Sequence, residues 1–190
     1  MTALSRFERD DGGIAIRPFR QSDDERLFEA GRESIAEVGR WLPWCHPDYA
    51  LRDAREWVAF ARAQFECDGE YHFAVVALDP ELSTPGAILG GVGLNELRRP
   101  HGVANLGYWV RTGAAGRGVC TRAVRLLAPL SFELGLTRLE ILASPDNAAS
   151  LRVAEKAGAV REGVLRDRLR IGGELHDAVC CSIVPSDLDL

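Results

Sequence analysis

Several features are missing from the 190-residue sequence, and each absence narrows the function. No apolar run approaches the roughly 20 residues that cross a membrane, and the N-terminus has no apolar signal region. A net charge of −5 provides no general basic surface, which argues against nucleic-acid binding through phosphate contacts. The histidines and cysteines show no metal-ligand spacing, and the cysteine count is odd. We therefore expect a cytoplasmic protein with free thiols, no metal, no membrane anchor and no nucleic-acid partner.

What is present has the proportions of one soluble domain. Hydrophobic residues make up 46% and charged residues 27%, close to globular averages, and the length suffices for one substantial core. No internal repeat or linker interrupts the chain. We expect a single domain over residues 1–190, with residues 1–12 as a loose polar lead-in.

Apolar periodicity predicts strands and helices in mixed order, which indicates a mixed α/β (α+β) fold. Strands are expected over residues 14–19, 71–78, 87–97, 103–111 and 136–144, with a closing hairpin of 160–170 and 174–184. Helices are expected over residues 22–33, 51–67, 119–135 and 145–158, the first of them capped by Ser22.

The richest chemical signal lies over residues 106–123, where an apolar strand leads through small residues into a long helix. Helix starts leave backbone N–H groups unpaired and carry the positive end of the helix dipole. Gly116 and Gly118 have no Cβ, so a bulky anion can approach those groups closely. The turn predicts a phosphate site, with Arg117, Arg122 and Arg125 adding positive charge.

Taken alone, this turn fits more than one phosphate ligand. Gly116-x-Gly118-x-x-Thr121 is similar to the dinucleotide fingerprint, and Glu140 falls about 20 residues further on. Too few residues follow for further strand–helix units, however, which disfavours a nucleotide-dependent oxidoreductase. No Walker sequence occurs.

Further motifs in a fixed order resemble the GNAT acetyltransferases, and within them the RimJ/RimL-type branch, which acetylates protein N-terminal α-amines. They are Gly107-Tyr108-Trp109, residues 115–123, Pro145-Asp146-Asn147-Ala148-Ala149-Ser150, Glu155-Lys156-Ala157-Gly158 and residues 162–166. The resemblance covers about residues 14–184. It implies the GNAT fold, a mixed and mostly antiparallel sheet of about seven strands that is splayed near its centre and flanked by helices.

The resemblance implies acetyl-CoA as cosubstrate. The CoA pyrophosphate would bind backbone N–H groups of Gly116, Arg117, Gly118, Val119, Cys120 and Thr121. The pantetheine arm would pair with the strand residues Tyr108, Trp109, Val110 and Arg111. On the far side, Asn147 would contact the arm and Ser150 would lie near the thioester sulfur.

For catalysis we predict Ser150 as proton donor to the leaving sulfur and Glu96 as base, with Asp167 as second choice. The base is open because an acidic residue frequent in this branch is replaced by Asn105. Each group also has a structural alternative, because serine can bond within its own helical turn and surface acids can simply be solvated.

The predicted acceptor site is lined by Trp41, Trp44 and Tyr108, although the tryptophans could equally pack on the core. The predicted reaction is direct acetyl transfer in a ternary complex to a primary amine, above all a protein N-terminal α-amine. A small-molecule amine acetyltransferase and a non-catalytic acyl-CoA-binding module are the alternatives. The resemblance also allows a homodimer.

Overall fold

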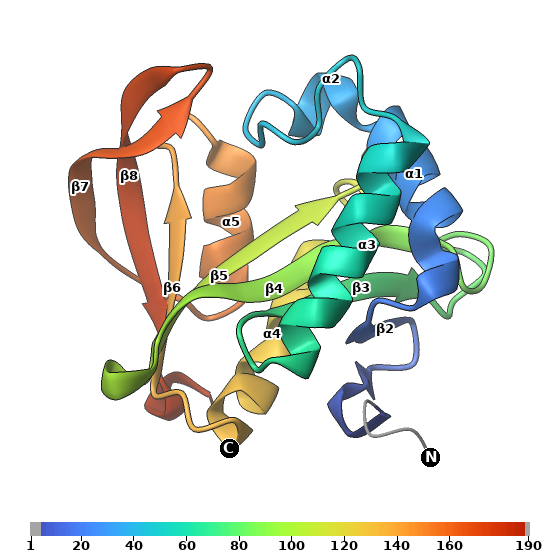
Figure 1. The fold of residues 1–190 in the computed structure, drawn as a ribbon. Coiled ribbons are helices and arrows are strands. Elements are labelled where there is room, and N and C mark those ends of the chain that lie inside the picture. Colours follow the sequence, from blue (N-terminus) through green and yellow to red (C-terminus); the bar gives the residue numbers. More distant parts are fainter. Residues whose placement is uncertain (1–4, 189–190) are drawn as a thin grey trace.

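The computed structural model describes residues 5–188, which form one eight-stranded sheet with helices on both faces (Figure 1). The strand order is β1-β2-β3-β4-β5-β6-β8-β7. The strands are β1 (Arg9–Asp10), β2 (Ile14–Pro18), β3 (Tyr71–Ala77), β4 (Ile88–Arg98), β5 (Val103–Val110), β6 (Arg138–Ala143), β7 (Val160–Ile171) and β8 (Glu174–Ile183). The α-helices are α1 (Asp24–Glu33), α2 (Ile35–Val38), α3 (Leu51–Glu66), α4 (Val119–Glu133) and α5 (Ala148–Lys156). The mixed α/β prediction is confirmed, with element ends shifted by a few residues.

The N-terminal segment contributes a strand to the sheet. Arg9–Asp10 pairs with β2 and brings the number of strands to eight, in agreement with the predicted sheet of about seven. The expected loose lead-in is wrong from Ser5 onward, because Phe7 packs edge-on against Phe65 with ring centroids 5.4 Å apart. Burial of this aromatic ring fixes the segment on the core. Residues 1–4 lie outside the described residues.

Two apolar layers cover the two faces of the sheet (Figure 1). The layer under α4 and α5 includes Phe73, Leu94, Leu106, Leu127 and Leu139. The layer under α1 and α3 includes Phe19, Leu27, Val58, Ala74 and Val76. Because side chains alternate along each strand, β3 supplies both layers at once, and its seven residues are all buried.

A buried ion pair fixes the entry to α1. The Arg17 guanidinium, on β2, donates to both carboxylate oxygens of Asp23 at 2.6 and 2.8 Å. Asp23 also accepts from the backbone N–H of Arg20 at 2.7 Å. The predicted cap, Ser22, is exposed, and Asp23 holds the turn instead. Charge and hydrogen bonding are therefore both satisfied inside the fold.

The sheet is splayed between β5 and β6, the one parallel pair among the strands of residues 5–188. These strands pair only through Val103 with Arg138, Ala104 with Leu139 and Asn105 with Glu140. Beyond Asn105 they diverge, as Figure 1 shows, while β5 remains paired with β4 as far as Val110. One side of β5 thus keeps free backbone groups at the centre of the sheet. Among the described residues, no helix is both long and apolar enough to cross a membrane.

Candidate active site

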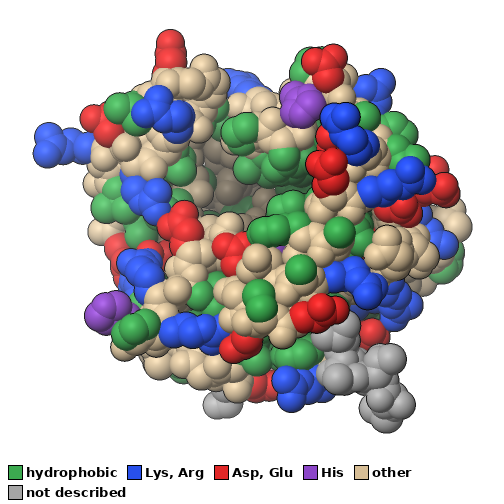
Figure 2. Space-filling model, viewed as in Figure 1, with side chains coloured by type: hydrophobic (Ala, Val, Ile, Leu, Met, Phe, Trp, Pro, Cys, Tyr) green, Lys and Arg blue, Asp and Glu red, His purple; other side chains and the backbone are tan. Residues whose placement is uncertain are grey.

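A cleft of about 1240 Å³ occupies the splay and continues over the face of the sheet beside α3. Figure 2 shows the hollow, with hydrophobic side chains on its walls and charged side chains around its rim. Its lining comes from β3, β4, β5, the start of α4, the end of β6, α5 and the β7 residues Arg168–Ile171, which lie next to the hairpin turn. The predicted cofactor and acceptor regions therefore share one cavity.

The glycine turn before α4 presents bare backbone N–H groups. Gly116 and Gly118 have φ of +74° and +78°, which favours glycine, and a Cβ at either position would meet nothing within 4 Å. The glycines are thus required by backbone conformation rather than by crowding. Within the described part of the chain, the N–H groups of residues 116–121 find no acceptor, and no side chain caps the helix. This arrangement fits a diphosphate.

The arginines near this turn have hydrogen-bond partners within the protein. Arg117 donates to the carbonyls of Glu81 and Leu82, and Arg122 is paired with Asp11. Arg125 donates to the carbonyl of Lys156. Of these three charges, only that of Arg122 is neutralised by a carboxylate, and Arg117 and Arg125 keep their positive charge near the turn.

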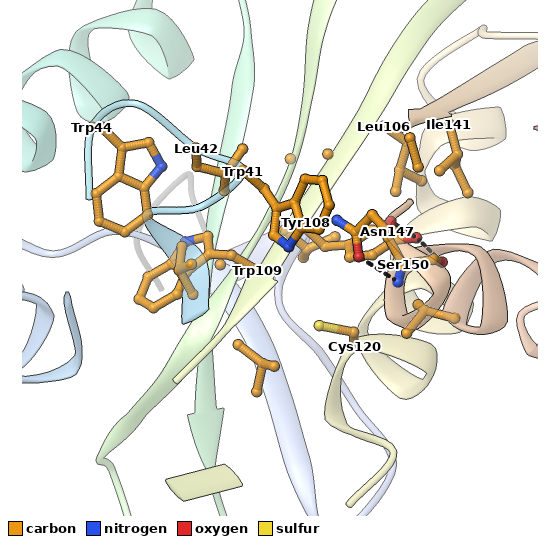
Figure 3. A pocket seen from close by; sticks show the side chains of 18 of the residues that line it. Trp41, Leu42, Trp44, Leu106, Tyr108, Trp109, Cys120, Ile141, Asn147 and Ser150 are labelled. Carbon is orange, nitrogen blue, oxygen red and sulfur yellow. Dashed lines mark hydrogen bonds between the residues drawn. The ribbon is translucent and has the colours of Figure 1, made fainter. Parts of the chain in front are cut away.

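Three predicted residues converge on the other side of the splay (Figure 3). The Asn147 side chain caps α5 by accepting from the Ser150 N–H at 3.1 Å. The Tyr108 hydroxyl, reaching from β5, donates to the Ser150 carbonyl at 2.9 Å and lies 3.1 Å from the Ser150 hydroxyl. Ser150 therefore faces Tyr108 and the cleft rather than a carbonyl of its own helix.

Burial suppresses ionisation of the tyrosine in this trio. Burial raises the pKa of Tyr108 far above its usual value, so the phenol stays protonated at neutral pH. Cys120, beside it on the cleft, is buried in apolar surroundings that raise the pKa of its thiol to about 12. The thiol is therefore held in its protonated form, which is not the nucleophilic form.

The aromatic wall lies on the opposite face of β5 (Figure 3). Trp109 packs edge-on against Trp44, with ring centroids 5.0 Å apart, and Trp44 packs against Tyr49 at 5.5 Å. Trp41 lines the same cavity. The structure thus places both predicted tryptophans on the cleft while Trp44 also packs on the core.

Three predicted polar residues are placed less favourably. The Arg111 side chain pairs with Glu33 on α1 and is absent from the cleft lining, so only its backbone can serve a ligand. Glu96 lines the cleft, but its side chain is 58% exposed and lies 3.0 Å from Arg168. Asp167 is outside the lining and its own N–H donates to Asp177.

Sequence reasoning missed a polar group in the cleft floor. His72 lies within a strand of otherwise apolar residues and is only 8% exposed, yet it lines the cavity. Asn105 donates its side-chain amide to Asn95 at 2.7 Å on the same floor. An ionisable residue inside the apolar run 71–77 was the available signal for His72.

Comparison with known proteins agrees with this geometry. Residues 14–160 match the acetyltransferase (GNAT) domain. YdaF of Bacillus subtilis, named as a candidate ribosomal N-acetyltransferase, is 30% identical over 90% of this chain and 91% of its own. YjcK of the same organism, named as a probable N-acetyltransferase, is 32% identical over 92% and 95% of the two chains.

A solved structure shows the same fold. Mycobacterium smegmatis RimJ, in complex with CoA-disulfide, superposes with a TM-score of 0.83 at 21% identity, over 96% of this chain and 88% of that one. Free N–H groups before α4, the splayed sheet and these matches lead to one assignment. The chain belongs to the GNAT family of N-acetyltransferases.

Proposed function

We propose that this protein acetylates the N-terminal α-amine of a protein, with acetyl-CoA as donor. The observation that carries the proposal is the single cleft, which joins a backbone diphosphate site to an aromatic acceptor wall through the opening between β5 and β6. The name of YdaF, a ribosomal N-acetyltransferase candidate, supports a protein acceptor.

The residues would divide the work as follows. The N–H groups of residues 116–121 hold the pyrophosphate, and the free edge of β5 pairs with the pantetheine arm. Asn147 contacts the arm from α5, and the backbone N–H near Val110 stabilises negative charge on the thioester oxygen. Holding both reactants in one cavity supplies much of the rate, on the order of 7–11 kcal/mol in favourable cases.

Bond changes at the thioester require one proton donor. The neutral amine forms the C–N bond, the C–S bond breaks, and the sulfur takes a proton from the Ser150 hydroxyl. Tyr108, whose hydroxyl lies 3.1 Å from that of Ser150, orients the serine. Ser150 regains its proton from solvent after the thiol leaves. The amine gives up one proton as it becomes an amide, and Glu96 and His72 are the basic groups on the cleft floor and rim that could receive it.

Ser150→Ala is expected to lower kcat by about 100-fold or more while acetyl-CoA affinity stays the same, because the leaving thiolate loses its proton donor. Steady-state kinetics and calorimetric titration separate the two effects. Ser22→Ala, at an exposed serine away from the cleft, is the matched control. Unchanged kcat in the Ser150 variant would remove this residue from the reaction.

The function itself is tested by thiol release with a panel of acceptors. We expect acetyl-CoA, and not NAD or ATP, to stabilise the protein, by about 2.7 kcal/mol at ~100 times its Kd. Thiol release should follow with free N-terminal peptides and vanish when the same peptides are N-acetylated. Faster turnover of polyamines or amino acids would establish the small-molecule alternative, and stabilisation without turnover would establish a binding module.

A further inference from the structure

We propose that the Glu70–His72 pair takes up the amine proton, with His72 Nδ1 as the accepting atom through a single water at the floor of the acceptor cleft. The inference rests on the proposed acetyl transfer, and it assigns the base that the family resemblance left open. Nothing in the motif set singles out either residue.

The hydrogen bond to Glu70 fixes which imidazole nitrogen is basic. His72 Nε2 lies 2.8 Å from a Glu70 carboxylate oxygen. An ionised carboxylate can only accept, so Nε2 carries the hydrogen and Nδ1 keeps its lone pair. Nδ1 has no hydrogen-bond partner in the described part of the chain, and no fully buried side-chain nitrogen or oxygen there is left without one. Nδ1 is therefore open to the cleft.

The sheet register aims Nδ1 at the reaction centre. His72 on β3 lies opposite Gly93 on β4, and Gly93 lies opposite Gly107 on β5. Nδ1 sits where a side chain of Gly93 would begin, 2.8 Å from the position of its Cβ. At Gly107, the next in the row, a Cβ would meet only the side-chain nitrogen of Asn105, at 4.0 Å. Nδ1 thus lies at one end of a gap above Gly93 and Gly107, and the other end of the gap is the opening between β5 and β6.

This gap is as wide as a solvent-mediated proton transfer requires. Neighbouring strands lie about 4.8 Å apart, so the row from His72 to Gly107 spans about 10 Å between backbones. The imidazole already leans over Gly93 and covers part of that distance. Gly107 directly precedes Tyr108, whose hydroxyl contacts Ser150 on the opposite face. An amine attacking a thioester held there lies within reach of Nδ1 through one water.

The surroundings keep the imidazole neutral and oriented. Trp57 packs edge-on against it at 4.8 Å and Phe60 lies at 5.9 Å. Burial lowers the pKa of His72 below its usual 6.5, although Glu70 opposes this. β2 pairs with β3 only as far as Phe73, so it ends one residue before the position of His72. The charged side chains that line the whole cleft with His72 are Glu37, Asp53, Glu56, Glu96, Arg152, Lys156, Arg168 and Arg170.

The protons balance without any further reactant. One proton passes from the amine through water to Nδ1, while the sulfur receives a proton from Ser150. The C–N bond replaces the C–S bond, and no group is oxidised or reduced. After the products leave, His72 gives its proton to solvent and Ser150 takes one proton from solvent, which restores both residues.

The pH dependence of kcat/KM tests this assignment between about pH 5 and pH 9, with the best acceptor peptide. Protonation of the free α-amine, whose pKa is near 8, makes kcat/KM fall tenfold for each pH unit below that pKa. Below the pKa of His72 the fall in kcat/KM becomes steeper, a hundredfold for each pH unit, because only the neutral ring accepts a proton. This steeper part is the second order of decline. His72→Gln is expected to lower the upper plateau about 100-fold and to remove the second order of decline.

A second variant keeps the imidazole and its packing. Glu70→Gln is expected to lower the plateau and to move the second decline to lower pH, because the carboxylate raises the pKa of His72. If Glu70 and His72 had only a structural role, Glu70→Gln would not shift the pH at which the second decline of kcat/KM begins. His176→Gln, a histidine outside the cleft lining, is expected to match the unmodified protein. Thermal unfolding and acetyl-CoA titration of each variant check that fold and cosubstrate site are intact.

The contrary outcomes are distinct. An unchanged plateau in folded His72→Gln would overturn the assignment, and so would loss of the second decline in Glu96→Gln instead. If no peptide is acetylated but a small amine is, the protein-acceptor proposal fails and the same profile is measured with that amine. Absence of turnover with every amine would overturn both proposals.

Discussion

Gly118→Glu is expected to abolish acetyl-CoA binding, with Kd rising at least about 100-fold, or about 2.7 kcal/mol. Gly118 has φ of +78° and immediately precedes α4, where no side chain caps the free N–H groups. A carboxylate placed there is an internal competitor, because it can accept the same N–H groups and repels the diphosphate. Titration calorimetry with acetyl-CoA measures the loss directly.

The matched control for this change is Gly135→Glu, at the opposite end of α4. Gly135 has φ of +87° and, like Gly118, open space around its Cβ position. Both substitutions therefore carry a similar backbone cost, roughly 1–2 kcal/mol, but only one places a charge on the cleft. We expect both variants to lose similar thermal stability and only Gly135→Glu to bind acetyl-CoA normally. Equal affinities would refute the backbone diphosphate site.

Asp23→Ala is expected to destabilise the protein by about 3–5 kcal/mol, because it leaves the Arg17 guanidinium buried without a counter-charge. The Asp23 side chain is fully buried and that of Arg17 nearly so, and the pair is bidentate. The same change removes the acceptor for the Arg20 N–H. Against a typical total of about 5–15 kcal/mol, the loss is severe. Denaturant unfolding followed by circular dichroism measures it.

An exposed ion pair on the same segment provides the comparison. Glu8 lies 3.1 Å from Arg20, and both side chains are largely solvent-accessible. Glu8→Gln is expected to change the free energy of unfolding by less than about 1 kcal/mol. If Asp23→Ala were no more costly than Glu8→Gln, the buried pair would not be what secures the entry to α1.

Local sequence predicted most of the fold, because each helix and strand has its own apolar periodicity and is bounded by turn residues. The turn before α4 was visible from Gly116 and Gly118, and the hairpin from the residues between β7 and β8. The two-residue β1 was not visible, because its pairing depends on Phe7 packing against Phe65 from a distant helix. The cap of the first turn was placed at Ser22 instead of Asp23, because the partner that decides it, Arg17, lies on another element.

The site was predictable where backbone and motif define it and unpredictable where tertiary contacts do. Asn147 and Ser150 belong to a motif that carries the family resemblance, and the structure places both on the cleft. The partners of Arg117 and Arg111 come from other parts of the chain, so local sequence could not show that these side chains are engaged. The role proposed for His72 depends on Gly93 and Gly107, which lie on the next two strands and which the sheet register places in line with it.

The divergence of β5 from β6 has a consequence for solution behaviour. Strands with unpaired backbone groups usually lie at a sheet's outer border, where charge, proline or bulges discourage another chain from adding to them. In this protein the unpaired backbone groups lie at the centre of the sheet, along the half-buried residues of β5 that follow Gly107. A ligand that pairs with these groups would also cover backbone to which another chain could add a strand.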